Sequence, residues 1–138
     1  MDAIKVFLVD DDSIFCFLFQ KLLDQHSNKS IELIVFHDGY SAAEYFRKNK
    51  SNPLTYPDIL FIDINMPLMN GWELLETIYN EDLFKSKNVM RYIISSSISN
   101  ADKHHRNKAS DYIEFITKPI SNKDLFSIID NITLNNKS

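Results

Sequence analysis

Short apolar segments alternate with amphipathic segments along the chain. Five of the apolar segments are rich in β-branched and aromatic residues, as strands are, and they occupy positions 4–9, 31–36, 59–62, 89–94 and 112–116. Several of them are apolar at every position instead of at every second one. This pattern indicates strands that are covered on both faces of a sheet.

Helical patterns lie between these strands. The first has the i, i+3, i+4, i+7 spacing of a buried helix face, at Phe15, Leu18, Phe19 and Leu22. Shorter patterns predict helices over 42–46, 72–79 and 101–109. A fifth helix begins near Ser121 and Asp124, which resemble a capping box, and its apolar stripe consists of Leu125, Ile128, Ile129 and Ile132. Five strands alternating with five helices predict an α/β fold with a parallel sheet and right-handed crossovers.

Length and composition favour one globular domain. The chain has 138 residues, of which 44% are hydrophobic and 25% charged, and this length leaves little room for a second core. We expect a single domain over 1–138 with an ordered core of about 3–134, because polar chain ends tend to fray. The net charge of -4, from 15 basic and 19 acidic residues, argues against nucleic-acid binding, which needs basic residues to neutralise phosphates.

Residue counts exclude several other chemistries. The two glycines, Gly39 and Gly71, are too few and too far apart for a P-loop or a GxGxxG dinucleotide loop. The single cysteine, Cys16, rules out an internal disulfide and a CxxC pair. The longest apolar run, over 14–19, is too short to span a bilayer, and the first residues do not read as a signal peptide. We therefore expect a cytoplasmic protein with no membrane partner.

Polar residues stand at the ends of four predicted strands, where parallel α/β sheets bind their ligands. They are Asp10, Asp11 and Asp12 after the first strand, Asp63 after the third, Ser95 after the fourth and Lys118 after the fifth. Two carboxylates about 4 Å apart repel by roughly 4 kcal/mol at an effective dielectric of about 20, so such a cluster needs a cation or a proton. Oxygen ligands favour Mg²⁺. With the lysine and a hydroxyl, the cluster predicts a phosphoryl site in which a carboxylate attacks phosphorus.

Four motifs in order carry a resemblance to a known family. VDDD at 9–12, FIDINMPLMNGWELL at 61–75, IISSS at 93–97 and FITKP at 115–119 resemble the landmarks of a two-component response-regulator receiver domain, in its single-domain, chemotaxis-regulator-like form. The resemblance covers nearly the whole chain. It implies a doubly wound, five-stranded parallel sheet with five helices, in the flavodoxin-like strand order 2-1-3-4-5.

The resemblance also implies roles for the carboxylates. Asp63 is the phosphoacceptor. Asp11, Asp63 and the backbone carbonyl of Asn65 bind Mg²⁺ directly, and Asp10 binds it through water. Asp12 has a different role, because a negative charge at the start of a helix is favoured by the helix dipole.

Lys118 and Pro119 form the fifth-strand landmark. The resemblance implies that Lys118 binds a phosphoryl oxygen and pairs with Asp63 when no phosphate is present. Pro119 stands where the family often has a cis peptide bond, which makes the Lys118-Pro119 bond a candidate for one.

Two residues resemble the family's conformational switch. Ser95 matches the hydroxyl that moves to the phosphoryl group, although Ser96 or Ser97 would take this role if the strand ended later. Phe115 matches the aromatic position that rotates inward, but it lacks the tyrosine hydroxyl of some members. Asn65 and Ser97 occupy positions that tune phosphate lifetime, and neither is charged.

The first predicted helix carries more apolar residues than its buried stripe uses. Cys16 and Phe17 lie off the stripe and Ile14 lies at its edge. Either this helix is packed more deeply than usual, or Ile14 and Phe17 form an exposed patch beside the phosphorylation site. In the family that surface meets the histidine donor domain.

These features predict a stand-alone response regulator receiver. It accepts a phosphoryl group from a histidine kinase or phosphotransfer protein onto Asp63 with Mg²⁺, and signals through phosphorylation-dependent protein contacts or an onward phosphorelay. We expect no enzymatic activity beyond its own phosphorylation and dephosphorylation, and either a monomer or a weak homodimer. One alternative is a non-phosphorylated, receiver-like protein-binding module, against which the complete acidic set argues. Another is a phosphohydrolase, but Asn65 stands where such enzymes need a second acid.

Overall fold

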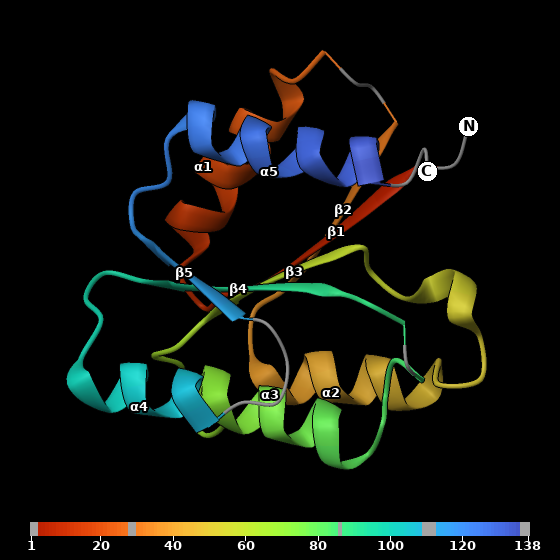
Figure 1. The fold of residues 1–138 in the computed structure, drawn as a ribbon, viewed down its shortest axis with the longest axis vertical. Helices are drawn as coiled ribbons and strands as arrows, with labels where there is room; N and C mark the ends of the chain where they lie inside the picture. Colours follow the sequence, from red (N-terminus) through yellow and green to blue (C-terminus); the bar gives the residue numbers. More distant parts are fainter. Residues whose placement is uncertain (1–2, 28–29, 86, 109–112, 136–138) are drawn as a thin grey trace.

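A parallel sheet of five strands forms the centre of the molecule (Figure 1). The computed structural model describes residues 3–27, 30–85, 87–108 and 113–135. The strands are β1 (Ile4–Val9), β2 (Ile31–Phe36), β3 (Ile59–Asp63), β4 (Met90–Ser95) and β5 (Ile113–Thr117). Their order is β2-β1-β3-β4-β5 and every neighbouring pair is parallel, as the resemblance implied. The predicted strand ends agree within one residue, apart from Tyr112, which lies outside the described residues.

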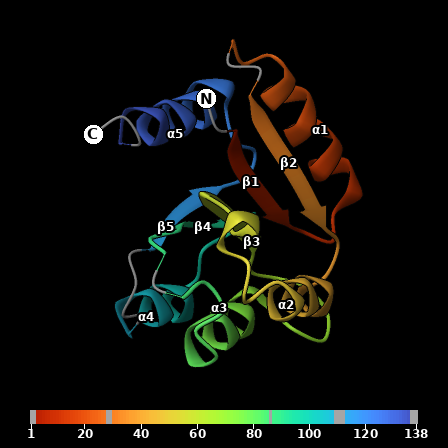
Figure 2. The same cartoon turned by 90° about the vertical axis from the view of Figure 1, so that its right-hand side faces the viewer.

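Helices cover both faces of this sheet, as Figures 1 and 2 show. One face carries α1 (Ser13–Asp24) and α5 (Asn122–Asn135). The other carries α2 (Gly39–Lys48), α3 (Gly71–Asn80) and α4 (Asn100–Lys108), and a short 3-10 helix, η1 (Pro53–Thr55), precedes β3. The doubly wound α/β prediction is therefore confirmed. None of the helices within the described residues is long and apolar enough to cross a membrane.

The sheet separates two apolar layers. Along β1, Phe7 and Val9 pack toward the α2 and α3 side, whereas Val6 and Leu8 pack toward α1 and α5. β3 is buried at each of its five positions, which explains why its sequence is apolar without alternation. The strand order and these two layers bring the carboxyl ends of β1, β3, β4 and β5 to one edge of the sheet.

The buried face of α1 differs from the predicted stripe. Phe15 and Phe19 are buried as expected, but Leu18 is 54% exposed and Cys16 is buried in its place. The buried face is completed by Leu23, so it is rotated toward Cys16, whose Sγ lies 3.5 Å from the Asp10 carbonyl oxygen. Spacing alone fixes the period of a helix face but not its rotation, because apolar residues also stand on the solvent side.

Candidate functional site

Three carboxylates meet at the carboxyl edge of the sheet. Asp10 directly follows β1 and is fully buried, and Asp63 is the last residue of β3 and is 5% exposed. Asp11 is exposed beside them. One oxygen of each carboxylate can be chosen so that all lie within 4.8 Å of one another. The predicted convergence of these strand ends is therefore what the fold produces.

Asp12 is not part of this cluster. Its Oδ1 accepts hydrogen bonds from the backbone N–H groups of Ile14 and Phe15, each at 3.1 Å, so that it caps the N-terminus of α1. The backbone N–H of Asp12 in turn donates to Asp10 Oδ1 at 2.9 Å. The backbone of Asp12 therefore holds one oxygen of Asp10 in place, while the Asp12 carboxylate caps the N-terminus of α1.

The loop after Asp63 is held close to the strand end by a glycine. Gly71 lies so near that a Cβ atom there would stand 2.7 Å from the carbonyl oxygen of Asp63. Its N–H donates to the carbonyl of Ile64 at 3.0 Å. Just before it, Asn70 and Glu73 form a reciprocal capping box at the start of α3. The sequence Asn70-Gly71 thus begins the helix and also permits the close return of the chain.

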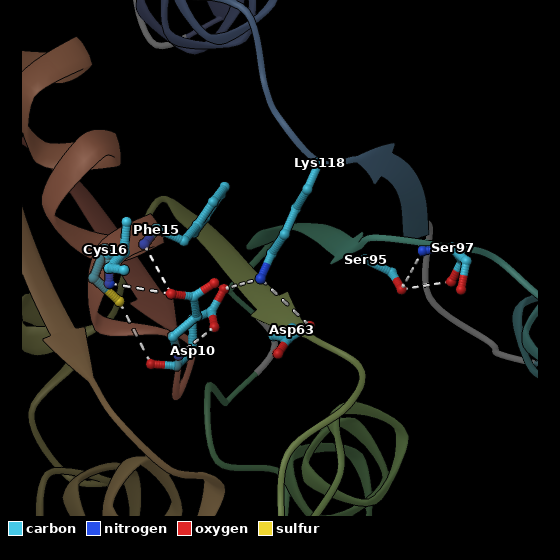
Figure 3. Close-up of polar contacts among 9 residues, drawn as sticks. Asp10, Phe15, Cys16, Asp63, Ser95, Ser97 and Lys118 are labelled. Carbon is cyan, nitrogen blue, oxygen red and sulfur yellow. Dashed lines mark hydrogen bonds and ion pairs between the residues drawn. The ribbon is translucent and has the colours of Figure 1, made fainter.

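Lys118 extends from the end of β5 between the two buried carboxylates (Figure 3). Its Nζ lies 2.9 Å from Asp10 Oδ2 and 3.9 Å from Asp63 Oδ1. The pair with Asp63 that the resemblance implied is therefore present, and Asp10, which it did not name as a partner, lies nearer. The Lys118-Pro119 peptide bond is cis, as the resemblance implied.

The charges of the cluster shift its ionisation. Burial and the charge of Asp10 raise the pKa of Asp63 to about 6, although Lys118 acts in the opposite direction. Burial alone would lower the pKa of Lys118, but the contact with Asp10 and the charges of Asp10 and Asp63 outweigh it and raise that pKa above its ordinary value. Burial and the charge of Asp10 also raise the pKa of the Cys16 thiol to about 11. At neutral pH the lysine is charged and the thiol is neutral.

Of the two predicted switch residues, Ser95 lies on the side of Lys118 that is away from Asp10 (Figure 3). Ser95 is the last residue of β4 and is fully buried, whereas Ser96 and Ser97 are exposed. The Ser95 hydroxyl donates to the carbonyl of Ser97 at 2.5 Å and accepts from its N–H at 3.2 Å (Figure 3). Phe115 is half-buried in β5, with its ring edge-on to Trp72 at 6.0 Å.

The donor set fits Mg²⁺. Its protein ligands are carboxylate oxygens, which suit a hard divalent cation. Asp10 Oδ2 is buried and forms an ion pair with Lys118, but accepts no hydrogen bond of good geometry from the described residues. The Lys118 ammonium offsets one of the three clustered carboxylate charges, and a divalent cation would balance the other two.

Two features of the site escaped prediction from the sequence. Phe15 lies with its ring 4.4 Å from Lys118 Nζ, and Trp72 Nε1 donates to Asp102 Oδ1 at 3.0 Å, which joins α3 to α4. Phe15 stands on the predicted apolar stripe, so nothing in the pattern distinguishes it from an ordinary core residue. Asp102 stands within a polar helix, where an acidic residue carries no signal of its own.

Comparison with known proteins identifies the class. Residues 6–130 match the model of the response regulator receiver domain, and the chain therefore belongs to that family. It is 30% identical over 129 residues to protein PilG of Pseudomonas aeruginosa, which covers 93% of this chain and 86% of PilG.

Solved structures agree with this family. A two-component response regulator from Cytophaga hutchinsonii is 25% identical with a TM-score of 0.79, over 96% of this chain and 98% of that one. The phosphorylated cyanobacterial phytochrome response regulator RcpA is 29% identical with a TM-score of 0.74, over 94% and 91%. This chain is thus a receiver domain of two-component signalling.

Proposed function

We propose that this chain is a response regulator receiver that accepts a phosphoryl group on Asp63 from a phosphohistidine of a sensor kinase or phosphotransfer protein. The observation that carries the proposal is the meeting of Asp10, Asp11 and Asp63 with the Lys118 ammonium at one edge of the sheet. In such a site the carboxylate of Asp63 is the nucleophile, and the cations neutralise the phosphoryl oxygens.

The transfer balances without a further reactant. A carboxylate oxygen of Asp63 attacks phosphorus, the bond from phosphorus to the donor imidazole nitrogen breaks, and that nitrogen keeps the electron pair. The product is an acyl phosphate on Asp63. Lys118 binds a phosphoryl oxygen. Asp11, Asp63 and the backbone carbonyl of Asn65 would hold Mg²⁺ directly, and Asp10 would hold it through water. When bound, Mg²⁺ offsets the charge on the phosphoryl oxygens and on the acidic cluster.

Signalling then depends on two residues beside the site. The Ser95 hydroxyl leaves Ser97 and bonds to the phosphoryl group, and Phe115 turns inward. These movements shift the chain between two conformations and change the surface formed by α4, β5 and α5. The output is a contact with a downstream protein or transfer of the phosphoryl group in a relay.

The exposed apolar residues of α1 support a contact surface for the phosphodonor. Ile14 is 75% exposed, Phe17 60% and Leu18 54%. All three lie in the first two turns of α1, which begins just after Asp10 and Asp11. We expect Phe17→Ala to leave phosphorylation by acetyl phosphate unchanged, because the ring lies outside the carboxylate cluster. It should slow transfer from any phosphotransfer protein that phosphorylates the wild-type chain. Equal rates from that protein would remove Phe17 from the contact surface.

The proposal is tested by intact mass after incubation with Mg²⁺ and acetyl phosphate. We expect a gain of one phosphoryl group, which is lost when Mg²⁺ is removed and in Asp63→Asn. Failure with acetyl phosphate and with phosphohistidine donors, together with no binding of Mg²⁺, would favour the alternative of a non-phosphorylated protein-binding module.

A further inference from the structure

An aromatic ring forms part of the site that holds Lys118. Phe15, in the first turn of α1, places its ring centroid 4.4 Å from the lysine Nζ. Phe15 is 8% exposed and the Lys118 side chain 13%, so solvent screens this contact only weakly. A cation over an aromatic face is attracted to it, most strongly where both are desolvated. No step of the proposed phosphotransfer uses this ring.

The ring itself is held in place from two directions. The backbone N–H of Phe15 donates to the capping carboxylate of Asp12 at 3.1 Å, and its side chain packs against Phe19 at a centroid distance of 6.0 Å. Phe19 in turn packs edge-on against Phe61 of β3 at 5.1 Å. These contacts hold the Phe15 ring in one position beside the Lys118 ammonium.

The position of the ammonium follows from its three contacts. It lies 2.9 Å from Asp10 Oδ2, 3.9 Å from Asp63 Oδ1 and 4.4 Å from the Phe15 ring. Phe15 belongs to α1, which begins directly after the Asp10 turn, so its attraction favours the Asp10 side of the cluster. This accounts for the shorter distance to Asp10 than to the expected partner, Asp63.

We propose that Phe15 is a positioning residue that holds the Lys118 ammonium against Asp10 and thereby weakens the binding of Mg²⁺. The inference rests on the proposed function, in which the Asp10 carboxylate binds Mg²⁺ through water. The ammonium and the divalent cation compete for the same buried carboxylate. Any contact that stabilises the Lys118–Asp10 pair therefore lowers the affinity for Mg²⁺, by reciprocal linkage.

The test is calorimetric titration of the full chain with MgCl₂ at neutral pH. Phe15→Leu removes the ring but keeps an apolar side chain, and should tighten Mg²⁺ binding by about threefold to thirtyfold, the range between an exposed and a desolvated cation–π contact. Phe15→Tyr keeps an aromatic ring at this position and should bind Mg²⁺ with the wild-type affinity. Phe46→Leu is the matched control, since Phe46 is a similarly buried phenylalanine in the apolar layer on the other face of the sheet; its Mg²⁺ affinity should stay at the wild-type value.

A double-mutant cycle separates this role from simple packing. In a Lys118→Met background no ammonium competes for Asp10, so Phe15→Leu should leave the Mg²⁺ affinity unchanged. Thermal unfolding of each variant confirms that it is folded, and Phe15→Met replaces Phe15→Leu if the latter is not. Two results would overturn this inference and leave the proposed function standing. In the first, the wild-type chain binds Mg²⁺ and Phe15→Leu or its replacement Phe15→Met binds it equally well. In the second, the loss of the Phe15 ring changes the affinity equally with and without Lys118. Absence of Mg²⁺ binding by the wild-type chain would overturn the proposed function and this inference with it.

Discussion

Replacing Asp63 by asparagine removes one buried charge from the acidic cluster and leaves its shape nearly unchanged. In the folded protein, burial and the charge of Asp10 raise the pKa of Asp63 to about 6, whereas an aspartate in an unfolded chain has a pKa of about 3.9. The folded state therefore binds this proton more tightly than the unfolded state. The wild-type chain loses stability as the pH rises from about 4 to about 6, and the loss is complete above that range.

The size of this loss follows from the same two values. A pKa difference of about 2 corresponds to about 3 kcal/mol at neutral pH. This is an upper limit, because the buried amide of asparagine carries its own desolvation cost. We expect Asp63→Asn to increase the free energy of unfolding by about 1–3 kcal/mol at pH 7.5 without Mg²⁺, and to have little effect at pH 4.

Urea unfolding of both proteins at pH 4, 5, 6 and 7.5 measures this difference. Added MgCl₂ should stabilise the wild-type chain more than Asp63→Asn, because a ligand that binds only the folded state stabilises it and the variant lacks one ligand oxygen. The difference between the two proteins should therefore shrink with Mg²⁺. An Asp63→Asn variant that is less stable at pH 7.5, or a difference independent of pH, would refute the argument from buried charge.

Three further substitutions test the supports of the site. Lys118→Met leaves the fully buried Asp10 without its ammonium partner and should lower the free energy of unfolding by about 3 kcal/mol. In a urea titration, MgCl₂ should recover much of this loss, and an unchanged unfolding midpoint would contradict the Lys118–Asp10 pair. Gly71→Ala places a Cβ 2.7 Å from a backbone oxygen of β3 and should lower the free energy of unfolding by about 2 kcal/mol or more. Gly39→Ala should lower the thermal midpoint less, because its Cβ would stand 3.0 Å from Met69 Cγ and 3.1 Å from the Met69 carbonyl oxygen. Equal losses would refute the close approach at Gly71. Asp102→Ala removes the hydrogen-bond partner of the single tryptophan indole and a side chain that caps α4. It should lower the free energy of unfolding by about 1–2 kcal/mol and change the tryptophan fluorescence. Unchanged fluorescence emission would argue against the hydrogen bond between Trp72 and Asp102.

Much of the fold could be predicted because the strands are buried on both faces. Their apolar runs stop where the chain meets the polar edge of the sheet, and this places Asp63 and Ser95 at strand ends to within one residue. In a parallel sheet those ends lie together whatever the loop conformations are. The convergence of Asp10, Asp63 and Lys118 was therefore predictable without knowledge of any side-chain contact.

The rest depends on contacts that a pattern does not contain. Leu18 matched the buried stripe of the first helix but is exposed, while Cys16 is buried, because the rotation of a helix is decided by the packing of both partners. Phe15 is apolar and on the stripe, yet its ring also contacts the ammonium of Lys118. That ammonium lies 2.9 Å from Asp10 and 3.9 Å from Asp63, and a difference of this size is determined only by the packing of the site.

The central claim is that Asp63, and not a neighbouring aspartate, forms the acyl phosphate. The most direct measurement is borohydride reduction of the chain after phosphorylation with acetyl phosphate and Mg²⁺, followed by mass spectrometry of its peptides. An acyl phosphate on an aspartate is reduced to homoserine, which marks the modified position. We predict homoserine at position 63, dependent on Mg²⁺ and absent when phosphodonor is omitted. Homoserine at position 10, 11 or 12 with an unmodified Asp63 would contradict the account.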